Sequence, residues 1–348
     1  MHSSYLFRTA GILALLSAFI VGGTSCGKKR NTPDVSHIEV EAEVQRFDRQ
    51  LFALDTNNID IALQGLIDSV PFTEFFIDFI LGYRVVASDS TVSREEIVRG
   101  YITHPEVRAL YDTVQQHFGN LDQLEEDLHV AFQYFKYYFP ELDPPEVYTM
   151  ISEYHTALLL PPEEEAIVVS LDLFMGPDYE IYRYHPLNLP AYISRTLTLN
   201  QLAARIVEAM VDDLVGESKH GRLLDVMVNE GKKLYLIDML LPNTPDSVKW
   251  GYTSGQTEWV KDNEYQMWVY LLDENLLYED NLNRFRKLVD YSPTSPGMPP
   301  ESPGRTANWL GLQIVKAYMS RFPETTIREL LSIDDAQEIL TRSRYKPD

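Results

Sequence analysis

Apolar positions recur every three or four residues over most of the chain, which predicts a protein built mainly from helices. The strongest pattern runs through residues 199–214, where the apolar positions form an unbroken stripe. A second amphipathic pattern starts near Arg222. The other predicted helical regions are 42–140 (with its first helix at 44–54), 256–278, 308–320 and 326–340.

Two segments in the middle of the chain do not follow the helical period. Residues 147–160 and 165–176 are rich in β-branched and aromatic residues and are bounded by proline and glycine turns, a composition typical of strands. Residues 292–305, which hold five of the 20 prolines, are predicted to form a long loop. The predicted fold class is therefore α+β, predominantly α-helical with a small central mixed β-sheet. We expect a helical N-terminal part (39–145) and a part with the sheet and further helices (146–348) to form one compact unit.

The N-terminus carries a pattern typical of exported proteins. Arg8 precedes a short apolar run, and residues 1–25 are predicted to be a secretory signal peptide. The small residues before Cys26, the only cysteine, resemble a bacterial lipobox. We therefore expect a mature protein that begins at an acylated Cys26, continues as a tether (26–38), and is held to membrane lipid without a membrane span. The alternative is an ordinary signal peptide followed by an incidental thiol.

The charge balance excludes one class of partner. The whole chain has a formal net charge of −22, and loss of Arg8 with the signal peptide lowers it to −23. Binding of nucleic acid requires cationic side chains that neutralise phosphates, so we expect no nucleic-acid partner. The acidity by itself identifies no other partner.

Residues 205–231 resemble the catalytic helix pair of a zinc protease that has lost its metal ligands. An H-E-x-x-H helix places two histidines one turn apart beside a general-base glutamate, and in one branch a glutamate on the next helix completes a His₂Glu site. Glu208 occupies the general-base position and Glu230 the third-ligand position, but Val207 and Val211 replace both histidines. This order predicts a degenerate zincin-like core, similar to the thermolysin-like helix pair, with Glu208 and Glu230 as vestigial site residues.

The same segment also fits an ordinary pair of packed helices. The two valines lie on the apolar stripe, where valine packs well. Glu208 lies three residues after Arg205, and Lys233 lies three residues after Glu230, a spacing at which opposite charges pair on a helix. Spacing alone therefore leaves both shared ancestry and coincidence open.

The chain lacks the motifs of the common catalytic sites. No two of its eight histidines are three to five residues apart, and it contains no H-E-x-x-H, G-x-S-x-G, P-loop or G-x-G-x-x-G motif. We therefore expect no metal ion and no other cofactor, and favour a protein that is not an enzyme. A hydrolase with an unrecognised site is the alternative, and acidic residues are too numerous to single out a catalytic pair.

Several long segments in a fixed order resemble the gliding-motility lipoprotein B family (GldB). The resemblance runs from "RFDRQLF" near residue 46 to "RYKP" near residue 347. It is carried by "LDLFMGPDYEIY", "LLDVMVNEGKKLYLIDMLLP", "GYTSGQTEWVKDNEYQMWVYL" and "SPGRTANWLGLQIVKAYM". The chain is also distantly similar to predicted zinc proteases in which H-E-x-x-H precedes a helix with "x-E-G", of which "NEG" at residues 229–231 remains.

The family resemblance implies a lipid-anchored lipoprotein of the cell envelope that supports gliding and the associated protein secretion, with no defined reaction. The implied partners are envelope proteins of the motility and secretion machinery, or an extended peptide bound along a sheet edge. Gly27 after the acylated cysteine, with a basic tether, favours the periplasmic face of the outer membrane. Arg305, with Trp309 and Trp259 in similar helices, forms a second candidate binding surface, and a buried structural role is the alternative for Arg305.

Overall fold

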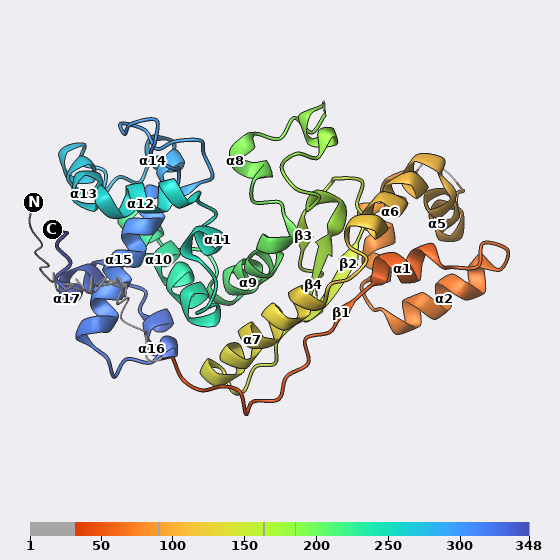
Figure 1. The fold of residues 1–348 in the computed structure, drawn as a ribbon, viewed down its shortest axis with the longest axis horizontal. Coiled ribbons are helices and arrows are strands. Elements are labelled where there is room, and N and C mark those ends of the chain that lie inside the picture. The colour runs from red at the N-terminus through yellow and green to blue at the C-terminus, as the bar shows by residue number, and fades with distance from the viewer. Residues whose placement is uncertain (1–31, 89–90, 163, 185, 348) are drawn as a thin grey trace, which may run out of the picture. The chain divides into compact units, whose positions relative to one another are not determined.

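The computed structural model describes residues 32–88, 91–162, 164–184 and 186–347 (Figure 1). The predicted signal peptide, Cys26 and the start of the tether lie outside these residues. Residues Val35–Asp348 form one compact unit, distinct from Met1–Asp34. Within the described ranges, no helix is both long and apolar enough to cross a membrane.

The N-terminal part of the compact unit is mainly helical, as the periodicity predicts, but the first helix, predicted at 44–54, starts only at Phe47, because Val44 and Gln45 pair with the sheet as a strand. The Ser93 side chain caps helix α5 (Arg94–Thr103) by accepting from the Glu96 N–H, and the Glu96 carboxylate completes the capping box by accepting from the Ser93 N–H. The elements are β1 (Val44–Gln45), α1 (Phe47–Phe52), α2 (Ile59–Ser69), α3 (Thr73–Phe75), the π-helix η1 (Phe76–Ile80), α4 (Tyr83–Val86), α5 (Arg94–Thr103), α6 (Pro105–His117) and α7 (Asp122–Tyr138).

A four-stranded mixed sheet lies in the middle of the chain, which confirms the predicted fold class. Its order is β1-β2-β4-β3, with β2 at Glu146–Met150, β3 at Leu158–Leu159 and β4 at Ala166–Ser170. The pairs β1–β2 and β2–β4 are parallel, and β3 runs antiparallel to β4. Helix α7 and the later helix α9 (Leu199–Val215) pack together, and α9 also contacts β4 (Figure 1).

The predicted strands at 147–160 and 165–176 are both wrong in their extent, because the chain turns after β2 and enters a 3₁₀ turn at Leu171–Leu173 directly after β4. Glu153 and Tyr154 both have positive φ, at 53° and 67°, in a region that residues other than glycine rarely adopt. The buried carboxylate of Asp172 holds this turn by accepting hydrogen bonds from the backbone N–H groups of Ser152 (3.3 Å) and Tyr154 (2.6 Å). The turn therefore depends on a residue that lies 18 or more positions further along the chain.

The C-terminal part of the unit is helical. The predicted helix at 256–278 is two helices, because the chain breaks at Asn263 between α12 and α13. The remaining elements are the 3₁₀ turns η2 (Leu171–Leu173) and η3 (Glu180–Arg183), α8 (Ala191–Ser194), α10 (Leu223–Leu240), α11 (Asp246–Trp250), α12 (Ser254–Asp262), α13 (Glu264–Asp273), α14 (Leu282–Val289), α15 (Thr306–Arg321), α16 (Ile327–Ser332) and α17 (Ala336–Ser343).

Helices α10 and α15 cross in direct backbone contact, which two glycines permit. A Cβ atom added to Gly311 would lie 1.7 Å from the carbonyl oxygen of Met227, and one added to Gly231 would lie 2.3 Å from the carbonyl carbon of Gly311. No side chain fits at either position without separating the helices. Gly231, the glycine of the "NEG" segment that resembles protease helices, is thus a packing residue that lets α15 come into backbone contact with α10.

A buried ion cluster fixes α10 to its neighbours. The two carboxylate oxygens of Asp238 lie 2.7 Å from the Lys249 ammonium group on α11 and 2.8 Å from that of Lys316 on α15. Burial alone would raise the pKa of Asp238, but the two ammonium groups outweigh it and lower the pKa to about 2. Asp238 therefore stabilises the fold in its charged form.

Candidate functional site

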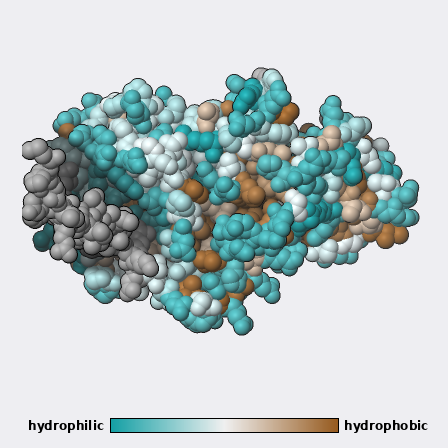
Figure 2. Space-filling model, viewed as in Figure 1, coloured by the Kyte–Doolittle hydropathy of each residue, from teal (hydrophilic) through white to brown (hydrophobic). Residues whose placement is uncertain are grey.

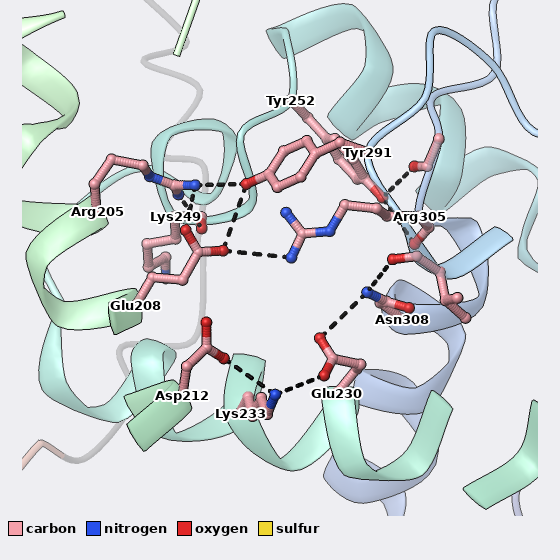
Figure 3. A network of polar contacts seen from close by, with 12 residues as sticks. Arg205, Glu208, Asp212, Glu230, Lys233, Lys249, Tyr252, Tyr291, Arg305 and Asn308 are labelled. Carbon is pink, nitrogen blue, oxygen red and sulfur yellow. Dashed lines mark hydrogen bonds and ion pairs between the residues drawn. The ribbon is translucent and has the colours of Figure 1, made fainter. Parts of the chain in front are cut away.

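The helix pair that resembles a protease site places its polar residues in a layer between α9, α10 and the start of α15 (Figure 3). On α9, Arg205, Glu208 and Asp212 follow one another at helical spacing beside the apolar stripe. Val207 and Val211 are fully buried in the core. The positions that would carry metal-binding histidines in a protease therefore serve packing here.

Glu208 is held by two arginines. The Arg205 guanidinium lies 2.5 Å from the Glu208 carboxylate. The guanidinium of Arg305, the residue directly before α15, lies 3.4 Å from the same carboxylate. The Tyr291 hydroxyl accepts a hydrogen bond from Arg205 (2.7 Å) and donates to Glu208 at 3.5 Å. The Arg305 guanidinium lies 4.3 Å from the centre of the Tyr291 ring, which adds a cation–π contact.

Glu230 is bound on the other side of the layer. The Lys233 ammonium group lies 2.8 Å from Glu230 and 3.2 Å from Asp212, and so joins α10 to α9. Asn308 on α15 donates a hydrogen bond to Glu230 at 3.4 Å. Glu208 and Glu230 therefore face the same polar layer, but each contacts a different residue at the start of α15.

The layer balances its charges internally. Burial by itself would lower the pKa of Arg205, but Glu208 and Tyr291 outweigh it and the pKa is raised. Burial would likewise lower the pKa of Lys233, and Glu230 and Asp212 raise it. These cations therefore keep their charge in the protein interior because carboxylates compensate it. Three cations and three carboxylates make a neutral cluster that links three helices.

The cluster does not form a metal site in the described part of the chain. Among these residues, no group of three or more His, Cys, Asp or Glu is arranged to hold a metal ion. A catalytic zinc site needs three protein ligands around one metal position, whereas here the carboxylates of Glu208 and Glu230 each contact a cationic side chain. Shared ancestry with zinc proteases stays a hypothesis.

The second set of predicted site residues lies mostly in the interior. Arg305 is 8% exposed and has φ of 59°, so its position agrees with the buried structural role left open by the sequence. Trp309 is 2% exposed, and Trp259 on α12 is partly buried. The sequence pattern missed Tyr291 and Asn308, which carry no local signal because their contacts with Arg205, Glu208 and Glu230 join residues 78 to 86 positions apart.

Comparison with known proteins gives one match that covers nearly the whole chain. No curated protein and no solved structure matches it. A protein-family model described as gliding motility protein GldB matches residues 28–347. This match spans the sheet, the charged layer and both crossing helices. The chain therefore belongs to the GldB family of gliding-motility lipoproteins.

Proposed function

We propose that this envelope lipoprotein acts in gliding motility and the associated secretion by binding other components, without catalysing a reaction. Family membership supports the cellular setting. The non-catalytic part of the proposal rests on the charged layer at the helix pair, where a hydrolase of the protease type would have its reactive groups. Its partners would be envelope proteins of the motility and secretion machinery.

The observation that carries the proposal is the engagement of Glu208. A general base needs a lone pair free to accept a proton from a bound water or substrate. The Glu208 carboxylate instead contacts two guanidinium groups and a tyrosine hydroxyl. Removing Glu208 would leave Arg205 and Arg305, which are both buried, without their shared carboxylate, which makes the layer a structural element.

The proposal includes an anchor at the N-terminus. An acylated Cys26 would hold the compact unit at a membrane surface, and the basic residues Lys28, Lys29 and Arg30 would face anionic headgroups. We place the protein on the periplasmic face of the outer membrane. Figure 2 shows that the face drawn there is mainly hydrophilic, with hydrophobic residues in several areas, one of them near the middle of the face.

The abundance dependence of function tests the proposal. In a gliding host, a tunable promoter lowers the amount of the protein while gliding speed and secretion are measured. A component that acts by stoichiometric contact loses function in proportion to its amount, whereas an enzyme retains function until little remains. In parallel, a photoreactive residue at the exposed positions Ile61, Tyr184 or Tyr265 should form a covalent adduct of discrete mass. Full function at a small residual amount, with no adduct, would indicate a hydrolase and overturn the proposal.

A further inference from the structure

The sheet has an open acidic edge, which we define as residues 39–43, directly before β1. Glu39, Glu41 and Glu43 are exposed and alternate with Val40 and Ala42, which pack against the core. This alternation has the period of a β-strand, so the three carboxylates lie on one side of an extended segment. Strand β1 is also the outermost strand of the sheet.

The backbone of the open acidic edge is not paired with the sheet. The parallel register pairs Val44 with Val147, and its continuation toward the N-terminus would place residues 41 and 42 opposite Pro144 and Pro145. Proline has no N–H to donate, so the ladder stops there. Within the described part of the chain, no backbone hydrogen bond outside the sheet ladder involves residues 39–43, whereas the N–H of the next residue, Val44, donates to the Glu125 carboxylate on α7. Residues 39–43 retain the donors and acceptors that an added strand uses.

A hollow of about 560 Å³ lies between the open acidic edge and the proline segment, a size typical of ligand-holding clefts. Its lining includes Asp143 and Glu146 in addition to the three glutamates of the edge. The only lysine or arginine in the lining is Lys136, whose ammonium group is already paired with Asp143 at 2.5 Å. The hollow is therefore strongly anionic and has no cation of its own to neutralise the edge.

The surrounding surface extends the same charge. A second hollow shares Asp143 and Glu146 and adds Glu164 and Glu165. A third shares Glu43 and is lined by further carboxylates of α7. None of the described residues pairs with the side chains of Glu39, Glu41 or Glu43. A partner that supplies cations at strand spacing would compensate charges that the described residues leave unpaired.

We propose that the open acidic edge is a docking site for an extended, basic segment of a partner protein. The segment adds as a strand beside residues 39–43, and its main-chain groups bond to the free backbone. Lysine or arginine at every second position meets Glu39, Glu41 and Glu43. This inference rests on the proposed contact function and names the surface and the chemistry of the partner.

The competing explanation for the glutamates is protection of the edge. Charged side chains on an edge strand prevent association with another edge. Under that explanation the edge binds no basic strand, and removal of the charges lets two copies of the chain associate. Binding and self-association are therefore measured on the same variants.

The test uses the full-length protein in detergent micelles and a fluorescent peptide of nine residues with lysine at alternate positions. We expect saturable binding that weakens as salt rises. The variant E39Q/E41Q/E43Q should weaken binding at least about tenfold, since each of three exposed ion pairs changes the dissociation constant by a factor of about two to five. The control variant E258Q/E274Q/E301Q changes three exposed glutamates elsewhere, has the same net charge, and should bind like the wild type.

A second peptide tests strand pairing separately from charge. The same lysine peptide with N-methylated backbone amides keeps its charge but cannot donate to the edge, and it should bind at least about tenfold more weakly. Equal loss of binding in both triple variants, equal binding of the methylated peptide, or no binding by the wild type would each overturn the inference. Dimerisation of E39Q/E41Q/E43Q without peptide binding would assign the glutamates to edge protection. If the peptide does not bind but covalent adducts form in cells, only the docking site at the open acidic edge is refuted. The proposed contact function is refuted separately, by full gliding and secretion at a small residual amount of the protein.

Discussion

Replacing Gly311 by alanine should destabilise the protein because it forces α10 and α15 apart. The added Cβ would lie 1.7 Å from the Met227 carbonyl oxygen, whereas ordinary van der Waals contact starts at 3.4 Å. The two helix backbones must therefore move apart by about the difference between these two distances. Overpacking of a core contact costs about 1–3 kcal/mol, and a backbone clash lies at the upper end. Alanine recovers about 1 kcal/mol of helix propensity, which leaves a net loss of about 2 kcal/mol.

The assay compares two glycine substitutions by thermal and urea unfolding. Gly65 lies on exposed α2 with nothing within 4 Å of an added Cβ, so Gly65→Ala should stabilise the protein by about 0.5–1 kcal/mol. For a compact unit of this size the Gly311→Ala loss corresponds to a melting temperature lower by about 3 °C. If Gly311→Ala melts at or above the wild type, the direct backbone contact between α10 and α15 is refuted.

Three further perturbations test other parts of the molecule. Cys26→Ala should abolish lipid attachment and leave an uncleaved or soluble precursor, and mass spectrometry that finds an unmodified thiol on the mature wild-type protein would contradict the anchor. Asp238→Asn should lower the free energy of unfolding by about 2 kcal/mol at pH 7. Because the pKa of Asp238 is lower in the folded than in the unfolded protein, this difference from the wild type should be full above about pH 5 and should shrink as the pH falls toward 2. A difference that stays constant with pH would contradict the ion cluster. Val207→His combined with Val211→His should lower the free energy of unfolding by about 1–3 kcal/mol for each buried imidazole. Recovery of the melting temperature on addition of zinc would support protease ancestry, whereas no recovery would show that the likeness of the helix pair to a protease site is a coincidence.

Local patterns in the sequence predicted the long helices well. The stripe at 199–214 corresponds to α9 (Leu199–Val215), and the pattern from Arg222 corresponds to α10. These helices bury one continuous face, so their period appears directly in the sequence. The turn after β2 could not be predicted in the same way, because Asp172 stabilises two residues at positive φ from a distant point in the chain.

The charged layer shows the same division between local and distant contacts. The pairs Arg205–Glu208 and Glu230–Lys233 follow from a spacing of three residues on a helix, and the structure confirms both. Arg305, at the start of the helix that crosses α10 at a pair of glycines, meets Glu208 from 97 positions further along the chain. No short-range pattern reports such a crossing, so spacing alone left the helix pair open to a catalytic interpretation.

The most direct test of the contact mechanism removes the proposed general base without unbalancing the layer. Glu208→Gln alone would leave Arg205 and Arg305 uncompensated and lower stability, which confounds any effect on catalysis. The double variant Arg205→Gln with Glu208→Gln removes both ion pairs of Glu208, but it takes away one charge of each sign, so the layer stays neutral. In a deletion strain, with cellular abundance measured by immunoblot, we predict that this variant restores gliding and secretion. Loss of both activities at wild-type abundance and normal folding would show that Glu208 takes part in a reaction.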